Sequence, residues 1–178
     1  MCNNAANFHT DPSKGLIVTG ESAGASLAAS LALQARDIHF QPAITGQHLV
    51  IPSLCNPHYH PNLHPNMTEN TYAPILSATA IMQFFDLYQL PDADHAAASP
   101  LLAVSHAGLP RTSLQIAGAD PLHDEGVAYA EVLRKDGTEV KERVYDGYPH
   151  GFMRIAYLQG AKEARKDTNE LLAWLLRR

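Results

Sequence analysis

The stretch GLIVTGESAGASLAASLALQA, residues 15–35, contains a strand pattern, a tight turn and a helix pattern in direct succession. Residues 15–19 are apolar and partly β-branched and follow the turn signal Asp11-Pro12. This pattern predicts a strand that is buried on both faces. Residues 23–35 are rich in Ala and Leu and lack proline, which predicts a buried helix. A strand that leads straight into a helix is the first half of a parallel β-α unit.

The same alternation of strands and helices continues toward the C-terminus. The sequence predicts strands around residues 48–51, 112–117 and 139–145, and helices over residues 76–88, 125–135 and 157–176. The last strand alternates charged and apolar residues, which is typical of a sheet edge with one wet face. We therefore expect an α/β fold with a mostly parallel sheet of about four strands flanked by helices, in one domain that covers residues 1–178.

Two further segments carry local signals. Residues 55–71 are rich in Pro, His and Asn, which predicts a loop. The helix over residues 125–135 has end signals: Asp124 suits its N-cap, Glu125 favours its positive end, and Gly137 can close it.

Composition limits the classes of partner. The 178 residues are 46% apolar and 17% charged, which is an ordinary globular balance. A net charge of −5 argues against nucleic acid or an anionic membrane surface. No apolar run is long enough to span a bilayer, and residues 1–4 lack the features of a signal peptide. Cys2 and Cys55 are too few for a disulfide framework, so we expect two free thiols and a cytoplasmic protein.

Ser22 is the candidate nucleophile. Gly20-Glu21-Ser22-Ala23-Gly24 fits the G-x-S-x-G pattern, in which a serine sits on a strained strand-to-helix turn. We expect that a side chain at either glycine would collide with neighbouring backbone. The turn would place the Ala23 N–H at a helix N-terminus, where it can stabilise an oxyanion. Glu21 is expected to be only the variable position of the pattern.

Serine needs a base to react at neutral pH, usually a histidine oriented by a carboxylate. Asp120 directly follows the strand at residues 112–117, so its carboxylate is expected at the same sheet edge as Ser22. His150 is the one histidine after the final strand and is the candidate base. Asp124 is the nearest rival for the acid, but its position suits a helix cap better. The set predicts a serine hydrolase.

Three motifs together resemble a known family. Residues 20–24 (GESAG), 120–126 (DPLHDEG) and 149–152 (PHGF) are similar to the hormone-sensitive-lipase branch of the α/β hydrolases, which includes carboxylesterases and arylacetamide-deacetylase-like enzymes. The resemblance implies hydrolysis of small carboxylic esters through an acyl-serine intermediate, with no metal and no cofactor.

The chain departs from that family at its N-terminal side. Members of the branch have a cap, about four more strands and a His-Gly-Gly-Gly-type loop before the nucleophile, whereas 21 residues precede Ser22 here. We therefore expect the C-terminal half of the fold, with an unpaired edge at residues 16–18 that favours self-association. With Ala23 as its only oxyanion donor, we expect turnover reduced on the order of a hundredfold or more. The alternative is a catalytically impaired fragment, or a pseudoenzyme that only binds ligands.

Two other clusters allow a functional and a structural interpretation. His58, His60 and His64 could bind zinc or nickel, but the segment offers no rigid scaffold, so we expect no metal site. Phe84, Phe85 and Tyr88 could line an acyl or alcohol pocket, but their helical spacing favours core packing.

Overall fold

Four parallel strands form one sheet in the order β1-β2-β3-β4. The computed structural model describes residues 5, 7, 9–58, 60–88 and 96–177, so Cys2 lies outside the described residues. The strands are β1 (Ile17–Glu21), β2 (Gly46–Val50), β3 (Arg111–Ala117) and β4 (Val140–Tyr145). The predicted α/β class and the parallel sheet are confirmed.

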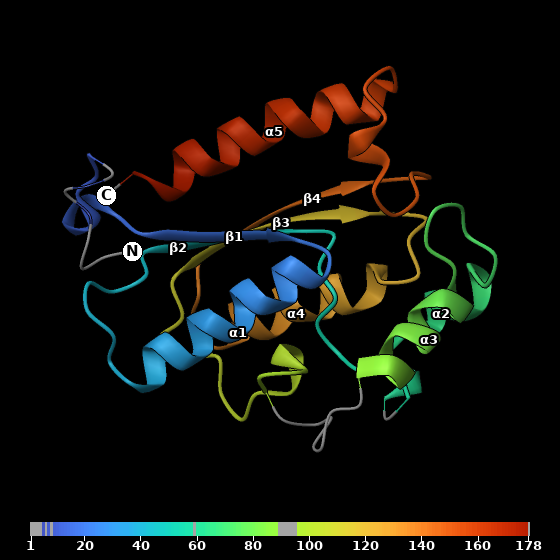
Figure 1. The fold of residues 1–178 in the computed structure, drawn as a ribbon, viewed down its shortest axis with the longest axis horizontal. Coiled ribbons are helices and arrows are strands. Elements are labelled where there is room, and N and C mark those ends of the chain that lie inside the picture. The colour runs from blue at the N-terminus through green and yellow to red at the C-terminus, as the bar shows by residue number, and fades with distance from the viewer. Residues whose placement is uncertain (1–4, 6, 8, 59, 89–95, 178) are drawn as a thin grey trace.

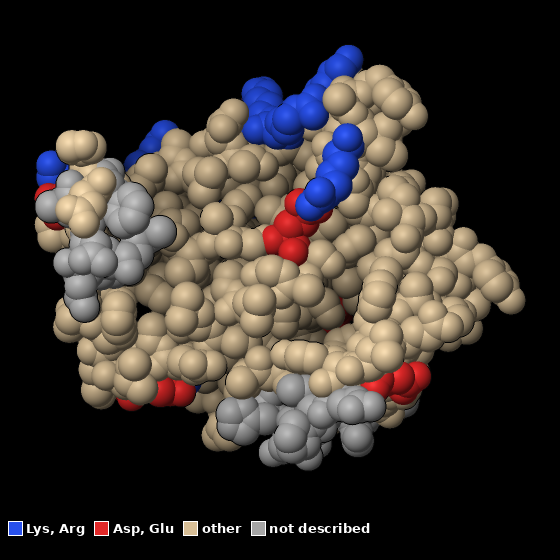
Figure 2. All heavy atoms as spheres, in the orientation of Figure 1, with Lys and Arg blue, Asp and Glu red and all other residues tan. Residues whose placement is uncertain are grey.

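Helices cover both faces of this sheet (Figure 1). α1 (Ala23–Asp37) and α4 (His123–Lys135) pack on one face, and α5 (Gln159–Leu175) packs on the other. Two shorter helices, α2 (Pro65–Glu69) and α3 (Ala78–Tyr88), lie beyond the carboxyl ends of the strands. The charged residues of α5 are exposed except Asp167, and basic side chains gather over this helix in Figure 2. In the described part of the chain, no helix combines the length and apolar character that a bilayer crossing requires.

The predicted loop over residues 55–71 is partly helical, which corrects the sequence-based expectation. Pro65 occupies the first turn of α2, where its missing N–H costs nothing. One of the prolines that predicted a loop therefore lies at the start of a helix. α4 begins at His123 with Leu122 as its N-cap, so Asp124 is not the cap. The Asp124 carboxylate instead accepts hydrogen bonds from the backbone and side chain of Asn66, both at 2.7 Å. Gly137 follows α4 with φ +88°, as its predicted role requires.

The first strand is less buried than its sequence predicts. Within β1, Thr19 is exposed and the other residues are half-buried. The reason is its place in the sheet, because β1 pairs only with β2 within the described residues and so lies at an edge. The following helix is also only partly buried, since Leu27 and Leu31 of α1 are 64% and 50% exposed.

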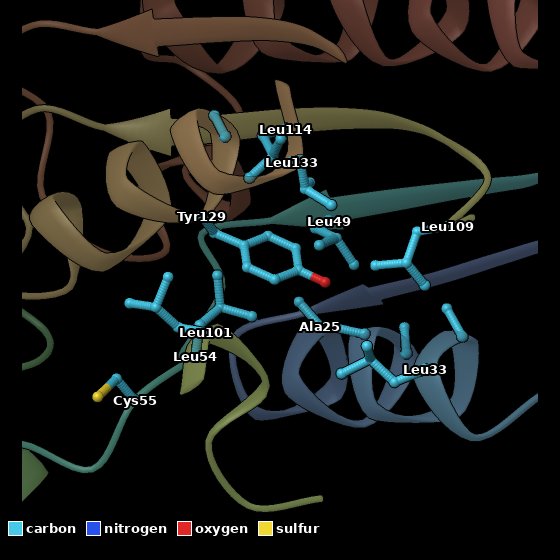
Figure 3. Close-up of a cluster of buried hydrophobic side chains, with 14 of the residues drawn as sticks. Ala25, Leu33, Leu49, Leu54, Cys55, Leu101, Leu109, Leu114, Tyr129 and Leu133 are labelled. Atoms are coloured by element: carbon cyan, nitrogen blue, oxygen red, sulfur yellow. The ribbon is translucent and has the colours of Figure 1, made fainter. Parts of the chain in front are cut away.

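The main core lies between the sheet and the two helices α1 and α4 (Figure 3). The ring of Tyr129 lies among leucine side chains from both helices and from the strands, including Leu33, Leu49, Leu114 and Leu133. A second cluster, centred on Phe152, packs α5 against the opposite face. Burial of this apolar surface holds the helices in place and so fixes the loops at the sheet edge.

Polar side chains also pair between neighbouring buried strands. Gln47 donates to the hydroxyl of Thr112 at 2.8 Å, and His48 Nδ1 lies 2.8 Å from Ser113 Oγ. His48 is only 2% exposed. Burial disfavours the imidazolium and lowers the pKa of His48 to about 4, although Gln115 partly opposes this shift.

The buried His48 makes the free energy of unfolding depend on pH. Its pKa is about 4 in the folded chain and 6.5 when unfolded, so between these values only the unfolded chain gains the proton. We expect stability to fall as the pH drops from 6.5 to 4, by up to about 3 kcal/mol from this group. In urea titrations at several pH values, His48→Asn should flatten this loss, whereas His39→Asn at an exposed position should not. Equal slopes for both variants and the wild type would contradict the assignment.

Candidate active site

The turn at Ser22 is strained in the way that its sequence pattern predicts. Ser22 has φ +55° and ψ −122°, a conformation that L-residues rarely adopt. Its N–H donates to the Val50 carbonyl at 2.9 Å, which ties the turn to the end of β2.

The two glycines of the pattern differ in their surroundings. A Cβ at Gly20 would overlap the backbone carbonyl of Gly24 and lie 2.6 Å from the Ala25 nitrogen. A Cβ at Gly24 would meet nothing within 4 Å, so the prediction that both glycines are sterically required is wrong for Gly24. The reason is that Gly24 already lies within α1 and faces open space, whereas Gly20 lies under the turn.

The structure brings Ser22, Asp120 and His150 into one hydrogen-bonded chain. His150 Nε2 lies 3.0 Å from Ser22 Oγ, and His150 Nδ1 lies 2.6 Å from Asp120 Oδ2. A carboxylate only accepts, so Nδ1 carries the proton and Nε2 is left to accept from the serine hydroxyl. Asp120 is 1% exposed, and its Oδ1 accepts from the Leu122 N–H at 3.0 Å. The three side chains that the sequence selected thus meet at the carboxyl edge of the sheet.

The loops that carry Asp120 and His150 are joined by backbone contacts. The Ala119 N–H donates to the Tyr148 carbonyl at 3.0 Å. Beyond His150, the buried ring of Phe152 stacks on Tyr148 with 4.7 Å between ring centroids. These contacts hold the imidazole against both of its partners.

Glu21, expected to be only the variable position of the motif, also has a partner. The Arg154 guanidinium donates to both of its carboxylate oxygens, at 2.9 and 3.1 Å. This pairing raises the pKa of Arg154. The ion pair connects the residue before Ser22 to the segment that follows His150.

A pocket of about 610 Å³ opens above Ser22 and His150. Apolar side chains from α1, the loop before α3, α3 itself and the N-cap of α4 make up most of its wall: Leu27, Ile75, Leu76, Ile81, Phe84, Phe85, Tyr88 and Leu122. Such a wall suits the apolar part of a small ligand.

The aromatic residues of α3 line this pocket, which corrects the expectation of core packing. Phe84 is 62% exposed and Tyr88 is 54% exposed. Helical spacing shows that a helix has an apolar face, but it does not show whether that face covers the core or a pocket. Sequence reasoning also missed Leu27. Its position on α1, five residues after Ser22, was the available signal.

The three clustered histidines do not assemble into a metal site. His58 Nε2 lies 3.0 Å from Asp86, whereas His64 is buried against Glu125. Among the described residues, no group of three or more His, Cys, Asp or Glu side chains could hold a metal ion. Cys55 is buried and forms no disulfide within the described residues.

Comparison with known proteins agrees with this geometry. The family model described as alpha/beta hydrolase fold matches residues 1–154. The chain belongs to the α/β-hydrolase family. The predicted resemblance to the hormone-sensitive-lipase branch is confirmed, because the relatives include a carboxylesterase and an esterase and the structural neighbours include esterases of this type.

Three relatives illustrate the similarity to other α/β hydrolases. The carboxylesterase NlhH of Mycobacterium tuberculosis is 36% identical over 180 residues, covering 98% of this chain and 54% of the relative. The crystal structure of vibralactone cyclase superposes with a TM-score of 0.92 at 33% identity, covering 98% of this chain and 53% of that one. A bacterial heroin esterase gives a TM-score of 0.87 at 28% identity, covering 99% and 56%. The chain therefore spans about half the length of these relatives.

Two single substitutions test the unequal glycines. Gly20→Ala should lower the free energy of unfolding by about 1–3 kcal/mol, because its methyl group has no space under the turn. Gly24→Ala should leave it unchanged or raise it by up to about 1 kcal/mol, because alanine favours a helix more than glycine does. Urea unfolding of both variants provides the measurement. Equal destabilisation by the two would show that the turn is not packed as described.

Proposed function

We propose that this chain hydrolyses carboxylic esters of small molecules through an acyl-serine intermediate. The single observation that carries the proposal is the hydrogen-bonded chain from Ser22 through His150 to Asp120, at the base of an apolar pocket. The relative named as a carboxylesterase and the esterase among the structural neighbours support the same chemistry.

Each residue has a defined role in the proposed reaction. His150 Nε2 accepts the Ser22 proton as Oγ attacks the ester carbonyl carbon, and the Ala23 N–H stabilises the resulting oxyanion. Asp120 holds the imidazole tautomer and stabilises the imidazolium. The tetrahedral intermediate then collapses, and His150 gives its proton to the departing alcohol.

Water completes the cycle. It attacks the acyl-serine carbonyl while His150 accepts one of its protons. Collapse of the second tetrahedral intermediate breaks the bond to Ser22 Oγ, which recovers its proton from His150, and the carboxylic acid leaves. All of these steps use groups of this chain, the ester and water. The slow turnover expected with Ala23 as oxyanion donor remains a prediction.

Active-site labelling and hydrolysis test the nucleophile directly. A fluorophosphonate probe should label Ser22 in the folded protein, and Ser22→Ala should abolish labelling and lower the hydrolysis of p-nitrophenyl esters by about a thousandfold or more. Ser105→Ala changes an exposed serine and serves as the matched control. Ligand binding to the pocket of folded wild-type protein without any labelling of Ser22 would favour the alternative, a ligand-binding module of the same fold.

We further propose that the edge of β1 mediates self-association. Within the described residues this strand pairs only with β2, and an edge strand offers unpaired backbone groups to another chain. Exposed leucines on the adjacent α1 add apolar surface.

A charge at this edge should weaken the association. We expect sedimentation velocity to show concentration-dependent oligomers for the wild type and a shift toward monomer for Thr19→Lys, because Thr19 is exposed on β1. Asn169→Lys adds the same single charge at an exposed position of α5 and controls for charge alone. Oligomers that persist unchanged in Thr19→Lys would exclude this edge.

A further inference from the structure

Glu125 is a buried acid that the proposed reaction does not use. It lies in the first turn of α4, five residues after Asp120, and is 0% exposed. Its Oε2 accepts a hydrogen bond from the Cys55 N–H at 2.9 Å. The side chain of His64, 1% exposed, approaches the same oxygen with Nε2 at 3.8 Å. From its sequence position Glu125 is expected only to favour the positive end of its helix, and nothing in the local pattern indicates its burial.

The surroundings of Glu125 do not suit a carboxylate. In the described part of the chain, Glu125 Oε1 and both ring nitrogens of His64 have no hydrogen-bond partner. His64 is also the one basic side chain that forms an ion-pair contact with Glu125 among the described residues. A buried charge without a charged partner and a full set of hydrogen bonds is strongly unfavourable.

The titration of this pair agrees with its burial. Burial raises the pKa of Glu125 well above its usual value, and the charge of Asp120 raises it further. The N–H groups of Leu54 and Cys55 and the side chain of Ser53 oppose this shift. Burial lowers the pKa of His64 to about 4, with Asp124 opposing the shift and His60 adding to it. Both shifts favour the uncharged forms, a neutral carboxylic acid beside a neutral imidazole.

Other titratable groups near the pair do not change this assignment. Tyr129 lies one turn further along α4, and burial raises its pKa, so its phenol stays neutral. His123 accompanies Asp124 at the start of α4, and the two side chains lie 2.9 Å apart.

The segment that Glu125 holds forms part of the active-site wall. Ser53 lines the pocket, and its N–H lies 3.5 Å from the Ser22 carbonyl. The next residue, Leu54, accepts a hydrogen bond from the Leu101 N–H at 3.1 Å. Glu125 Oε2 accepts a hydrogen bond from the N–H of Cys55, the residue after Leu54. The contact thus connects the helix that follows Asp120 to the wall beside Ser22.

We propose that Glu125 is a positioning residue that acts as a neutral carboxylic acid. With His64 as its buried neighbour, it binds the 53–55 segment to α4 and so positions the pocket wall beside Ser22. The kinetic consequence of this inference rests on the proposed esterase function. The protonation state of the Glu125 carboxyl group does not depend on that function.

Three substitutions separate shape, charge and helix effects. Glu125→Gln keeps the size, an accepting oxygen and the neutral state, and should keep kcat/KM within about threefold of the wild type. Glu125→Ala leaves the Cys55 N–H without its acceptor and should lower kcat/KM by about tenfold or more. Glu131→Gln makes the same amide change at an exposed position of α4 and should have no effect. Wild-type activity in Glu125→Ala would overturn the positioning role. Glu125→Gln protein that is inactive or unfolded would overturn the neutral acid.

Infrared spectroscopy provides a readout that does not depend on activity. The difference spectrum between wild type and Glu125→Gln at neutral pH should contain the carbonyl stretch of a protonated carboxylic acid, shifted in heavy water. Carboxylate bands in its place would overturn the assignment. If the wild type hydrolyses no ester, the proposed function fails, and the spectrum still decides the state of Glu125.

Discussion

Parallel pairing of the strands is the constraint on which the rest of the structure depends. Because β1, β3 and β4 run in the same direction, their carboxyl ends meet at one edge of the sheet. The segments that follow these strands carry Ser22, Asp120 and His150, which are far apart in the sequence. The paired ends, such as Ala117 opposite Tyr145, determine how closely the loops approach one another. A one-residue slip in register would turn every side chain of a strand to the opposite face.

The strained turn at Ser22 shows how the surrounding fold sustains an unfavourable conformation. A residue held at such backbone angles costs on the order of 1–3 kcal/mol. The hydrogen bond from the Ser22 N–H to the end of β2 and the absence of a side chain at Gly20 keep the turn closed. Core packing of α1 against the sheet then prevents the turn from relaxing. The hydroxyl group is therefore presented to His150 by the whole β1–α1 unit.

Two acidic residues near the start of α4 have different environments. Asp120 accepts from His150 and from a backbone N–H, which together suit a carboxylate. Glu125, five residues later, faces a buried imidazole whose nitrogens have no hydrogen-bond partner within the described residues. The physical difference lies in the neighbouring imidazole: Asp120 is hydrogen-bonded to His150, whereas the ring of His64 forms no hydrogen bond to Glu125. Neighbouring acids in one motif can thus have separate roles.

The sequence by itself determined the α/β class, the parallel sheet and the Ser22, Asp120 and His150 set, because hydrophobic period and the order of motifs along the chain are local properties. Only the tertiary structure decided which neighbours surround a given side chain. Gly24 faces open space, the aromatic face of α3 covers a pocket, and Glu125 is buried against His64. Burial and contact arise when distant segments pack together, and a local pattern does not contain that information.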